Sequence, residues 1–274
     1  MPPERLASYD EQALRDLHAW KNPKRTVRGR IGDRIERIIK ALIAYVPLGL
    51  VEKVLGWVLP RARDMTWRAT SRPLVLRAYR RAGKPVASIE GIARLDLRTV
   101  DSVAGHKRVH EGAVAGVEGA AAGFFGGWAL AADIAGVMLL SMRAVQSRAL
   151  VYGFDPSKDE ELAFVLQVLD AASRLGPDSK AAARTGVSLV GKQMANRAVV
   201  KQSLDQVLQR LPKQLTVRLA TMKAESIAPV IGAATSASFN AWYLQAVSHA
   251  ARMAYRERFL RRRYGDDVLS AYGL

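Results

Sequence analysis

Apolar residues recur at helical spacing along almost the whole chain, and no strand-like alternation extends beyond a few residues. The clearest case is the segment 24–46, where one stripe is apolar and the opposite face is cationic. The pattern predicts an all-α fold, a compact multi-helix bundle with long packed helices and no significant β-sheet. The apolar stripe of this segment comprises Val27, Ile31, Ile35, Ile38, Ile39, Leu42, Ile43 and Val46.

Proline, glycine and capping residues indicate where the helices begin and end. Asn22-Pro23 and Asp155-Pro156 each combine a capping side chain with a proline suited to the first turn of a helix. Gly83, with a proline two residues later, has the order typical of a helix C-terminus. No long linker and no internal repeat divides the chain. We therefore expect a single domain over 1–274, with a basic amphipathic portion at 1–84 and a Gly/Ala-rich core at 85–274.

Glycines recur every four residues in the middle of the chain. On a helix this spacing forms a smooth groove that lets another backbone approach closely. Such a groove suits either a tight crossing in a core or a helix pair inserted in a membrane. Glu118 and Asp133 interrupt the segment, and a charge at the bilayer centre costs roughly 2.5–3.5 kcal/mol. A simple transmembrane span is therefore disfavoured. The spaced glycines are Gly112, Gly116, Gly119, Gly123 and Gly127.

A second uncharged stretch, 226–251, contains no Asp, Glu, Lys or Arg. It is long enough to cross a bilayer, since about 20 residues suffice. It also contains Pro229, Asn240, Gln245 and His249, so its apolar character is weak. We expect a buried core helix here, packed against the Gly-rich helix at 112–142. A re-entrant helix is the alternative, in which the arginines at 252–263 would lie at lipid headgroups.

Composition adds a strong positive charge to this picture. The net charge is +17, and residues 1–110 carry 23 lysines and arginines against 11 acids, while residues 111–274 carry 19 against 14. This bias implies an anionic partner, either phospholipid headgroups or nucleic acid. The chain has no cysteine, which excludes disulfides, thiolate metal sites and cysteine nucleophiles. Residues 1–20 lack the apolar core of a secretory signal, so we expect a cytoplasmic protein.

The cationic face of the segment 24–46 is the favoured anionic-surface site. An apolar stripe opposite cations is typical of helices that lie on a membrane, although a core-facing helix of any basic protein has the same pattern. Nucleic acid is the rival partner, because Trp67 and Tyr79 are interleaved with arginines at 61–84 and could stack on bases. No nucleic-acid reader module is recognisable. The predicted surface comprises Arg25, Arg28, Arg34, Arg37 and Lys40.

No motif in the sequence establishes catalysis or a cofactor. His106 and His110 have the i, i+4 spacing of zinc ligands, but neither HExxH nor HxxEH is present. Residues 186–192 read G-V-S-L-V-G-K, which has the skeleton of a phosphate-binding loop, but Gln193 stands where Ser or Thr should hold magnesium and no strand precedes the loop. We therefore expect neither a metal nor a cofactor.

The middle and end of the chain resemble the EcsC family. The resemblance rests on three pieces in order: E-G-A-V-A-G-V-E-G-A-A-A-G leading into A-A-D-I at 131–134, then Y-G-F-D-P at 152–156, then P-V-I-G-A-A-T-S-A-S-F-N at 229–240. It implies an all-helical bacterial protein with no established activity, from a family named after a gene beside an ABC transporter. The matching positions are Asp133, Tyr152, Gly153 and Asn240; Gly153 would be a helix C′ residue. Asp133 and Asn240 would be buried polar groups that fix helix register.

These observations predict a peripheral membrane protein on the inner face of the cell membrane, bound to anionic lipid. A lipid or acyl chain held between the Gly/Ala surfaces, an ABC transporter or other protein partner, and a homo-oligomer are further hypotheses. The alternative is a hydrolase-like enzyme that uses Glu118, Asp133 or a histidine, which requires a pocket joining at least two of these groups. We expect Glu118, Asp133, Tyr152 and Asn240 to form a polar core with a functional or structural role.

Overall fold

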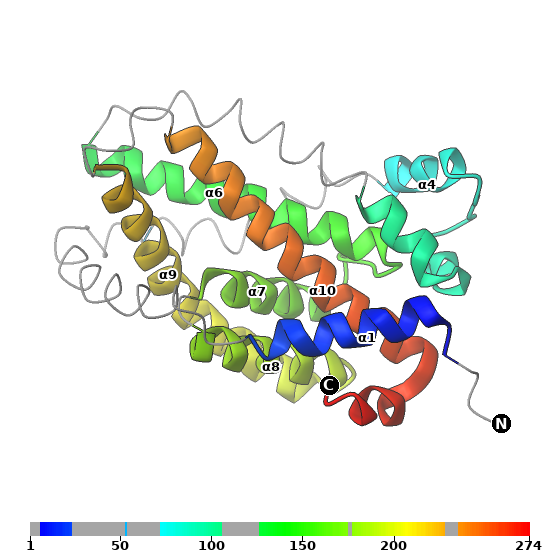
Figure 1. Ribbon diagram of the computed structural model, residues 1–274. Coiled ribbons are helices and arrows are strands. Elements are labelled where there is room, and N and C mark those ends of the chain that lie inside the picture. The colour runs from blue at the N-terminus through cyan, green and yellow to red at the C-terminus, as the bar shows by residue number, and fades with distance from the viewer. Residues whose placement is uncertain (1–5, 24–52, 54–71, 106–125, 175–176, 228–234) are drawn as a thin grey trace.

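A computed structural model describes residues 6–23, 53, 72–105, 126–174, 177–227 and 235–274. Helices dominate this part of the chain and it contains no strand, so the all-α prediction is confirmed (Figure 1). Residues 97–105 are also helical. The named elements are α1 (Ser8–Lys21), α4 (Arg72–Arg81), the 3-10 helix η1 (Glu90–Arg94), α6 (Gly126–Val151), α7 (Asp159–Ser173), α8 (Pro177–Lys192), α9 (Arg197–Ile227) and α10 (Thr235–Ala271).

Helix α7 lies at the centre of the bundle. It contacts α6, α8, α9 and α10, and its apolar residues are buried nearly all round rather than along one stripe. Helix α1 lies across α10 and α8, and α4 lies at the end of the molecule, beside α6 (Figure 1). The buried apolar cluster includes Leu14 of α1 and Tyr79 of α4 together with Leu169 of α7. Side chains from both the 1–84 and the 85–274 portions therefore share one core.

The expected pairing of the Gly-rich helix with the last long helix is found in the described residues. Helices α6 and α10 contact one another along their length (Figure 1). Arg148 of α6, almost fully buried, donates hydrogen bonds to the Ser248 hydroxyl of α10, at 2.8 and 3.1 Å, and to the Ala104 carbonyl. Gly112, Gly116, Gly119 and Gly123 lie outside the described residues. Gly127 is in the first turn of α6.

The predicted helix ends are confirmed at both glycines. Gly83 has φ of 71° and follows α4, and Gly153 has φ of 79° and follows α6. After α6, the Phe154 N–H donates to the Ala149 carbonyl at 2.9 Å and the Gly153 N–H donates to the Leu150 carbonyl at 3.1 Å. These two bonds define a Schellman motif, in which glycine occupies the left-handed C′ position because it has no Cβ.

One of the two predicted helix starts is wrong. Asp155 does not cap α7, which begins at Asp159. Its carboxylate instead accepts bonds from the Ser157 N–H at 3.1 Å and the Ser157 hydroxyl at 2.7 Å, so it forms a local turn before the helix. Asn22 ends α1, with its side-chain amide donating to the His18 carbonyl at 3.1 Å. Whether it also caps the following segment lies outside the described residues.

No helix in these described ranges has both the length and the apolar character needed to cross a bilayer. The two ends of the uncharged stretch 226–251 belong to different helices, α9 and α10. Helix α10 is broken at Gly265, where φ is 82° and ψ is 174°. This break turns the last residues back toward α1, where the His18 Nδ1 lies 2.8 Å from the Tyr272 carbonyl.

Candidate functional site

Helix α4 carries an exposed basic surface in the described part of the chain. Val75 and Tyr79 are buried against the bundle, and the Tyr79 hydroxyl donates to the Val151 carbonyl at 2.6 Å. The opposite side of α4 and the turn after it expose Arg77, Arg80, Arg81 and Lys84. These four cations have no ion pair with a carboxylate of the described residues. The chain between 65 and 89 contains no Asp or Glu, so we call this the α4 basic face.

Two side chains change the chemistry of the α4 basic face. Leu74 is 54% exposed and stands beside the cations, so the face combines charge with an apolar contact. The rival nucleic-acid hypothesis counted Tyr79 among the rings that could stack on bases, but this ring is fully buried and its hydroxyl is bonded within the fold. Trp67 lies outside the described residues. The described face therefore offers cations and an aliphatic side chain but no exposed aromatic ring.

The side chains of most predicted site residues lie outside the described part of the chain. Arg25, Arg28, Arg34, Arg37 and Lys40 lie outside the described residues, as do Glu118, His106 and His110. Asp133 is in α6 and Asn240 is in α10, and their side chains are outside the described part. Among the described residues, no three His, Asp or Glu side chains gather as metal ligands would.

Tyr152 is the predicted polar-core residue whose role the structure defines. Its ring is fully buried, and its hydroxyl donates to Asp101 Oδ1 at 2.5 Å. Asp101 is only 3% exposed. Its carboxylate also accepts a hydrogen bond from the Tyr9 hydroxyl at 2.9 Å and forms an ion pair with Arg256. Arg252 approaches Asp101 Oδ1 at 3.6 Å. One carboxylate thus joins α1, the helix at 97–105, the end of α6 and α10.

The pKa shifts around Asp101 have clear causes. Burial, and then the Asp101 charge, raise the pKa of Tyr152 well above its ordinary value. Burial alone would lower the pKa of Arg256, but the hydrogen bond and charge of Asp101 outweigh it and raise that pKa. The tyrosine is therefore a neutral donor and the arginine a permanent cation. This arrangement binds the helices together.

Four of the six arginines of α10 are paired with acids of the fold. Arg252 and Arg256 point inward to Asp101. Arg258 forms a two-pronged ion pair with Glu161, with nitrogen–oxygen distances of 2.7 and 2.8 Å. Arg261 pairs with the buried Glu257 at 2.8 Å. The charge of these four side chains is therefore compensated inside the protein, while Arg262 and Arg263 are exposed.

Glu257 is the centre of a second buried network. Besides Arg261, it accepts from the Lys21 ammonium at 2.9 Å and from the Ser188 hydroxyl at 2.9 Å. Burial lowers the pKa of Lys21, and the neighbouring Glu257 charge offsets only part of that effect. The network ties α1 and α8 to α10. Ser188 belongs to the G-V-S-L-V-G-K segment, and that segment is continuous helix in α8, so it forms no phosphate-binding loop.

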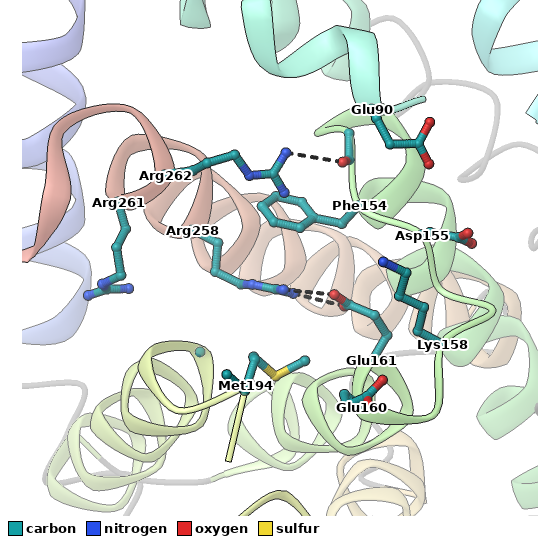
Figure 2. Close-up of a pocket in the computed structure, with 13 residues that line it drawn as sticks. Glu90, Phe154, Asp155, Lys158, Glu160, Glu161, Met194, Arg258, Arg261 and Arg262 are labelled. Carbon is teal, nitrogen blue, oxygen red and sulfur yellow. Dashed lines mark hydrogen bonds and ion pairs between the residues drawn. The ribbon is translucent and has the colours of Figure 1, made fainter. Parts of the chain in front are cut away.

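A cleft of about 670 Å³ opens between the loop after α6, the start of α7, the end of α8 and the last turns of α10 (Figure 2). Its walls carry acidic and basic side chains together with Phe154 and Met194. We call it the α7–α10 cleft. Its volume lies in the range of small-molecule sites, about 300–1,000 Å³. Of the predicted polar-core residues only Tyr152 has a described side chain, and it does not line the cleft.

Aromatic rings hold the arginines of the α7–α10 cleft in place. The Arg258 guanidinium lies 4.1 Å from the ring centroid of Phe154 and 4.4 Å from that of Phe164. Arg262 lies on the other side of Phe154, at 4.0 Å, so one ring is held between two guanidinium groups (Figure 2). Such contacts are worth about 0.5–2 kcal/mol each. They fix both side chains in defined positions.

Sequence reasoning missed the residues that organise these sites. Asp101, Glu161 and Glu257 carry no recognisable motif, and each bonds to at least one side chain more than 50 residues away along the chain. The spacing of the arginines in α10 was a signal that could have indicated which of them act together. Arg252 and Arg256 are four residues apart and share one face, and Arg258 and Arg262 share another.

The fold and its charged networks define an all-helical basic protein whose described polar centres are mostly internal ion pairs. The chain matches the EcsC protein family over residues 11–260, so it belongs to the EcsC family. It is also similar to a protein of Bacillus subtilis (strain 168) called "Uncharacterized protein YdbA". The two are 23% identical over 274 residues, which cover 94% of this chain and 95% of that protein. No solved structure matches the chain.

Proposed function

We propose that this protein binds peripherally to anionic membrane surfaces, on the inner face of the cell membrane, through the α4 basic face. The observation that carries the proposal is the exposure of Arg77, Arg80, Arg81 and Lys84 on a helix whose other side is buried, with no acid between 65 and 89. Each cation near an anionic leaflet contributes about 1 kcal/mol. Leu74 adds an apolar side chain that can enter the interface.

The α4 basic face favours lipid over nucleic acid as its anionic partner. Non-specific binding of single strands combines cations with aromatic rings that stack on bases. Tyr79 is buried in the described structure, so α4 contributes no such ring. An exposed leucine next to cations instead suits the boundary between headgroups and acyl chains. Binding to RNA or DNA with equal affinity is an outcome that the experiment below can detect.

Vesicle co-sedimentation tests the proposal, with neutral phosphatidylcholine vesicles compared with vesicles containing 30% phosphatidylglycerol. The test variant is Arg77→Gln/Arg80→Gln/Arg81→Gln. The matched control is Arg197→Gln/Lys201→Gln/Arg210→Gln, which removes three exposed cations from α9. We expect the α4 variant to bind anionic vesicles about 100-fold more weakly, since three cations contribute roughly 1 kcal/mol each. The α9 control should keep most of its binding.

Three outcomes would overturn the proposal. The first is equal loss in the α4 and α9 variants, which would mean that net charge alone drives binding. The second is no binding to anionic vesicles. The third is equal binding to a single-stranded oligonucleotide. An Arg28→Glu/Arg34→Glu/Arg37→Glu variant tests the segment 24–46 separately. Loss in this variant alone would assign the membrane contact to that segment instead of α4.

The other functional hypotheses stay predictions. The hydrolase hypothesis needs a pocket that joins two of Glu118, Asp133 and a histidine, and the side chains of Glu118 and Asp133 lie outside the described residues. An acyl chain between the Gly/Ala surfaces concerns residues that are mostly outside the described part. An ABC transporter partner follows only from the family resemblance.

A further inference from the structure

The α7–α10 cleft has a charge arrangement that differs from the buried networks beside it. Four carboxylates and four cations line it. Most of these are already engaged: Glu161 with Arg258, Asp155 with Arg72 at 2.7 Å, and Arg261 with Glu257. Glu90 bonds to its own backbone N–H and to the Ser88 hydroxyl, and both bonds lower the pKa of Glu90. The charged side chains of the cleft that have no such partner determine which ligand it can bind.

Arg262 and Lys158 are the two cations of the cleft lining that pair with none of the described carboxylates. No carboxylate of the described residues lies within ion-pair distance of either one. Arg262 makes one hydrogen bond, to the Gly153 carbonyl at 3.3 Å, out of the five N–H donors that a guanidinium offers. Partial desolvation, and then the neighbouring Arg258 charge, lower the pKa of Arg262, while the Glu161 and Glu90 charges act in the opposite direction; the side chain stays exposed to solvent.

Both cations are placed to act on one ligand. Arg262 is stacked on Phe154, which fixes the guanidinium before anything binds and reduces the entropy lost on binding. Lys158 projects into the same opening from the segment before α7 (Figure 2). Met194, which is partly exposed, supplies an apolar surface for the rest of a ligand, whereas Phe154 is buried between the two guanidinium groups. Glu160 is the remaining acid, on the side of the cleft nearest Met194 (Figure 2).

We propose that the α7–α10 cleft binds a phosphate ester, with Arg262 and Lys158 contacting the phosphate oxygens and Met194 contacting the organic part. A guanidinium fork and a mobile ammonium together match the several oxygens and the charge of up to −2 that a phosphate presents. The ester is either a lipid headgroup or a soluble small molecule. The proposal stands apart from membrane binding through α4, because the two sites share no residue.

Isothermal titration calorimetry tests the cleft with the full chain, with inorganic phosphate, glycerol 3-phosphate and monomeric dioctanoyl phosphatidylglycerol as probes. We expect Arg262→Gln to weaken binding of an ester at least 10-fold and Lys158→Gln several-fold. Glu160→Gln should strengthen binding, because it removes a negative charge from the cleft. The matched control is Arg263→Gln. Arg263 is also an exposed arginine of α10, but it bonds to the Leu95 carbonyl at 3.0 Å and does not line the cleft.

The outcomes separate the ligand sources and the two proposals. Tighter binding of the dioctanoyl lipid points to a headgroup, and tighter binding of glycerol 3-phosphate points to a soluble ester; either supports the cleft. Absence of binding by all three probes at millimolar concentration overturns the proposal. Equal weakening by Arg263→Gln and Arg262→Gln overturns it too. The α4 variant should bind the soluble ester normally, so failure of one site leaves the other testable.

Discussion

Replacing Asp101 with asparagine should strongly destabilise the fold. Asp101 is 3% exposed and receives two tyrosine hydroxyls and the Arg256 guanidinium. Asparagine keeps the size of the side chain but removes the negative charge. The side chain of Arg256, 6% exposed, would then keep only the more distant and half-exposed Asp16, whose carboxylate lies 3.4 Å away. The structure therefore predicts a buried cation with poor compensation.

The size of the effect follows from this burial. Breaking a buried ion pair by removing one partner costs about 3–5 kcal/mol, because the remaining charge is left without compensation. For a domain of this size each kcal/mol lowers Tm by roughly 2–4 °C, so a fall on the order of 10 °C is expected. Asp16→Asn removes the other acidic partner of Arg256, but from an exposed position. It should cost less than about 1 kcal/mol.

Urea unfolding followed by circular dichroism measures these differences, together with a double-mutant cycle that combines Asp101→Asn and Tyr152→Phe. Tyr152→Phe alone should cost about 1.5–3 kcal/mol, since it removes a hydrogen bond to a charged group. The double variant should lose clearly less than the sum, because both changes remove the same bond. A cost below 1 kcal/mol for Asp101→Asn, or strict additivity in the cycle, would refute the view that Asp101 holds these helices together.

Two further predictions concern backbone and pH. Gly153→Ala should destabilise the fold by about 2–3 kcal/mol, because residue 153 has a left-handed φ and an added Cβ would lie 3.1 Å from the Ile89 carbonyl. Gly83→Ala should cost only about 1 kcal/mol, because an added Cβ there has no neighbour within 4 Å. Equal costs of the two variants in thermal melts would contradict this account. Burial and the bond to Asp10 raise the pKa of Tyr264 to about 12, so its contribution to stability is complete below pH 10 and is lost between pH 10 and 12. The stability gap between the protein and Tyr264→Phe should therefore close over that range in urea titrations, and a constant gap would argue against the shift.

The sequence by itself determined the fold class and several helix ends. Helical periodicity is a local property, because side chains three and four residues apart share a face whatever the rest of the chain does. Gly83 and Gly153 were predictable for the same reason, since a left-handed C′ residue is set by the few residues around it. Asp155 was misjudged, because one aspartate can either cap a helix or close a turn, and its bonds to Ser157 favoured the turn.

Only the tertiary structure decided which charges are available for function. In the sequence, the arginines of α10 and those of α4 look alike, and both suit an anionic surface. Folding places Asp101 and Glu161 against α10, and Glu257 pairs with Arg261 one turn further along α10 itself, so most arginines of α10 are paired with acids. In α4, Arg72 pairs with Asp155, whereas Arg77, Arg80 and Arg81 stay exposed. Asp101 and Glu161 come from positions 97 to 155 residues away from Arg258 and Arg256, a separation that no local pattern encodes. Ion pairing acts over a few ångströms in space, so only the packed helices show which arginines remain free to bind a ligand.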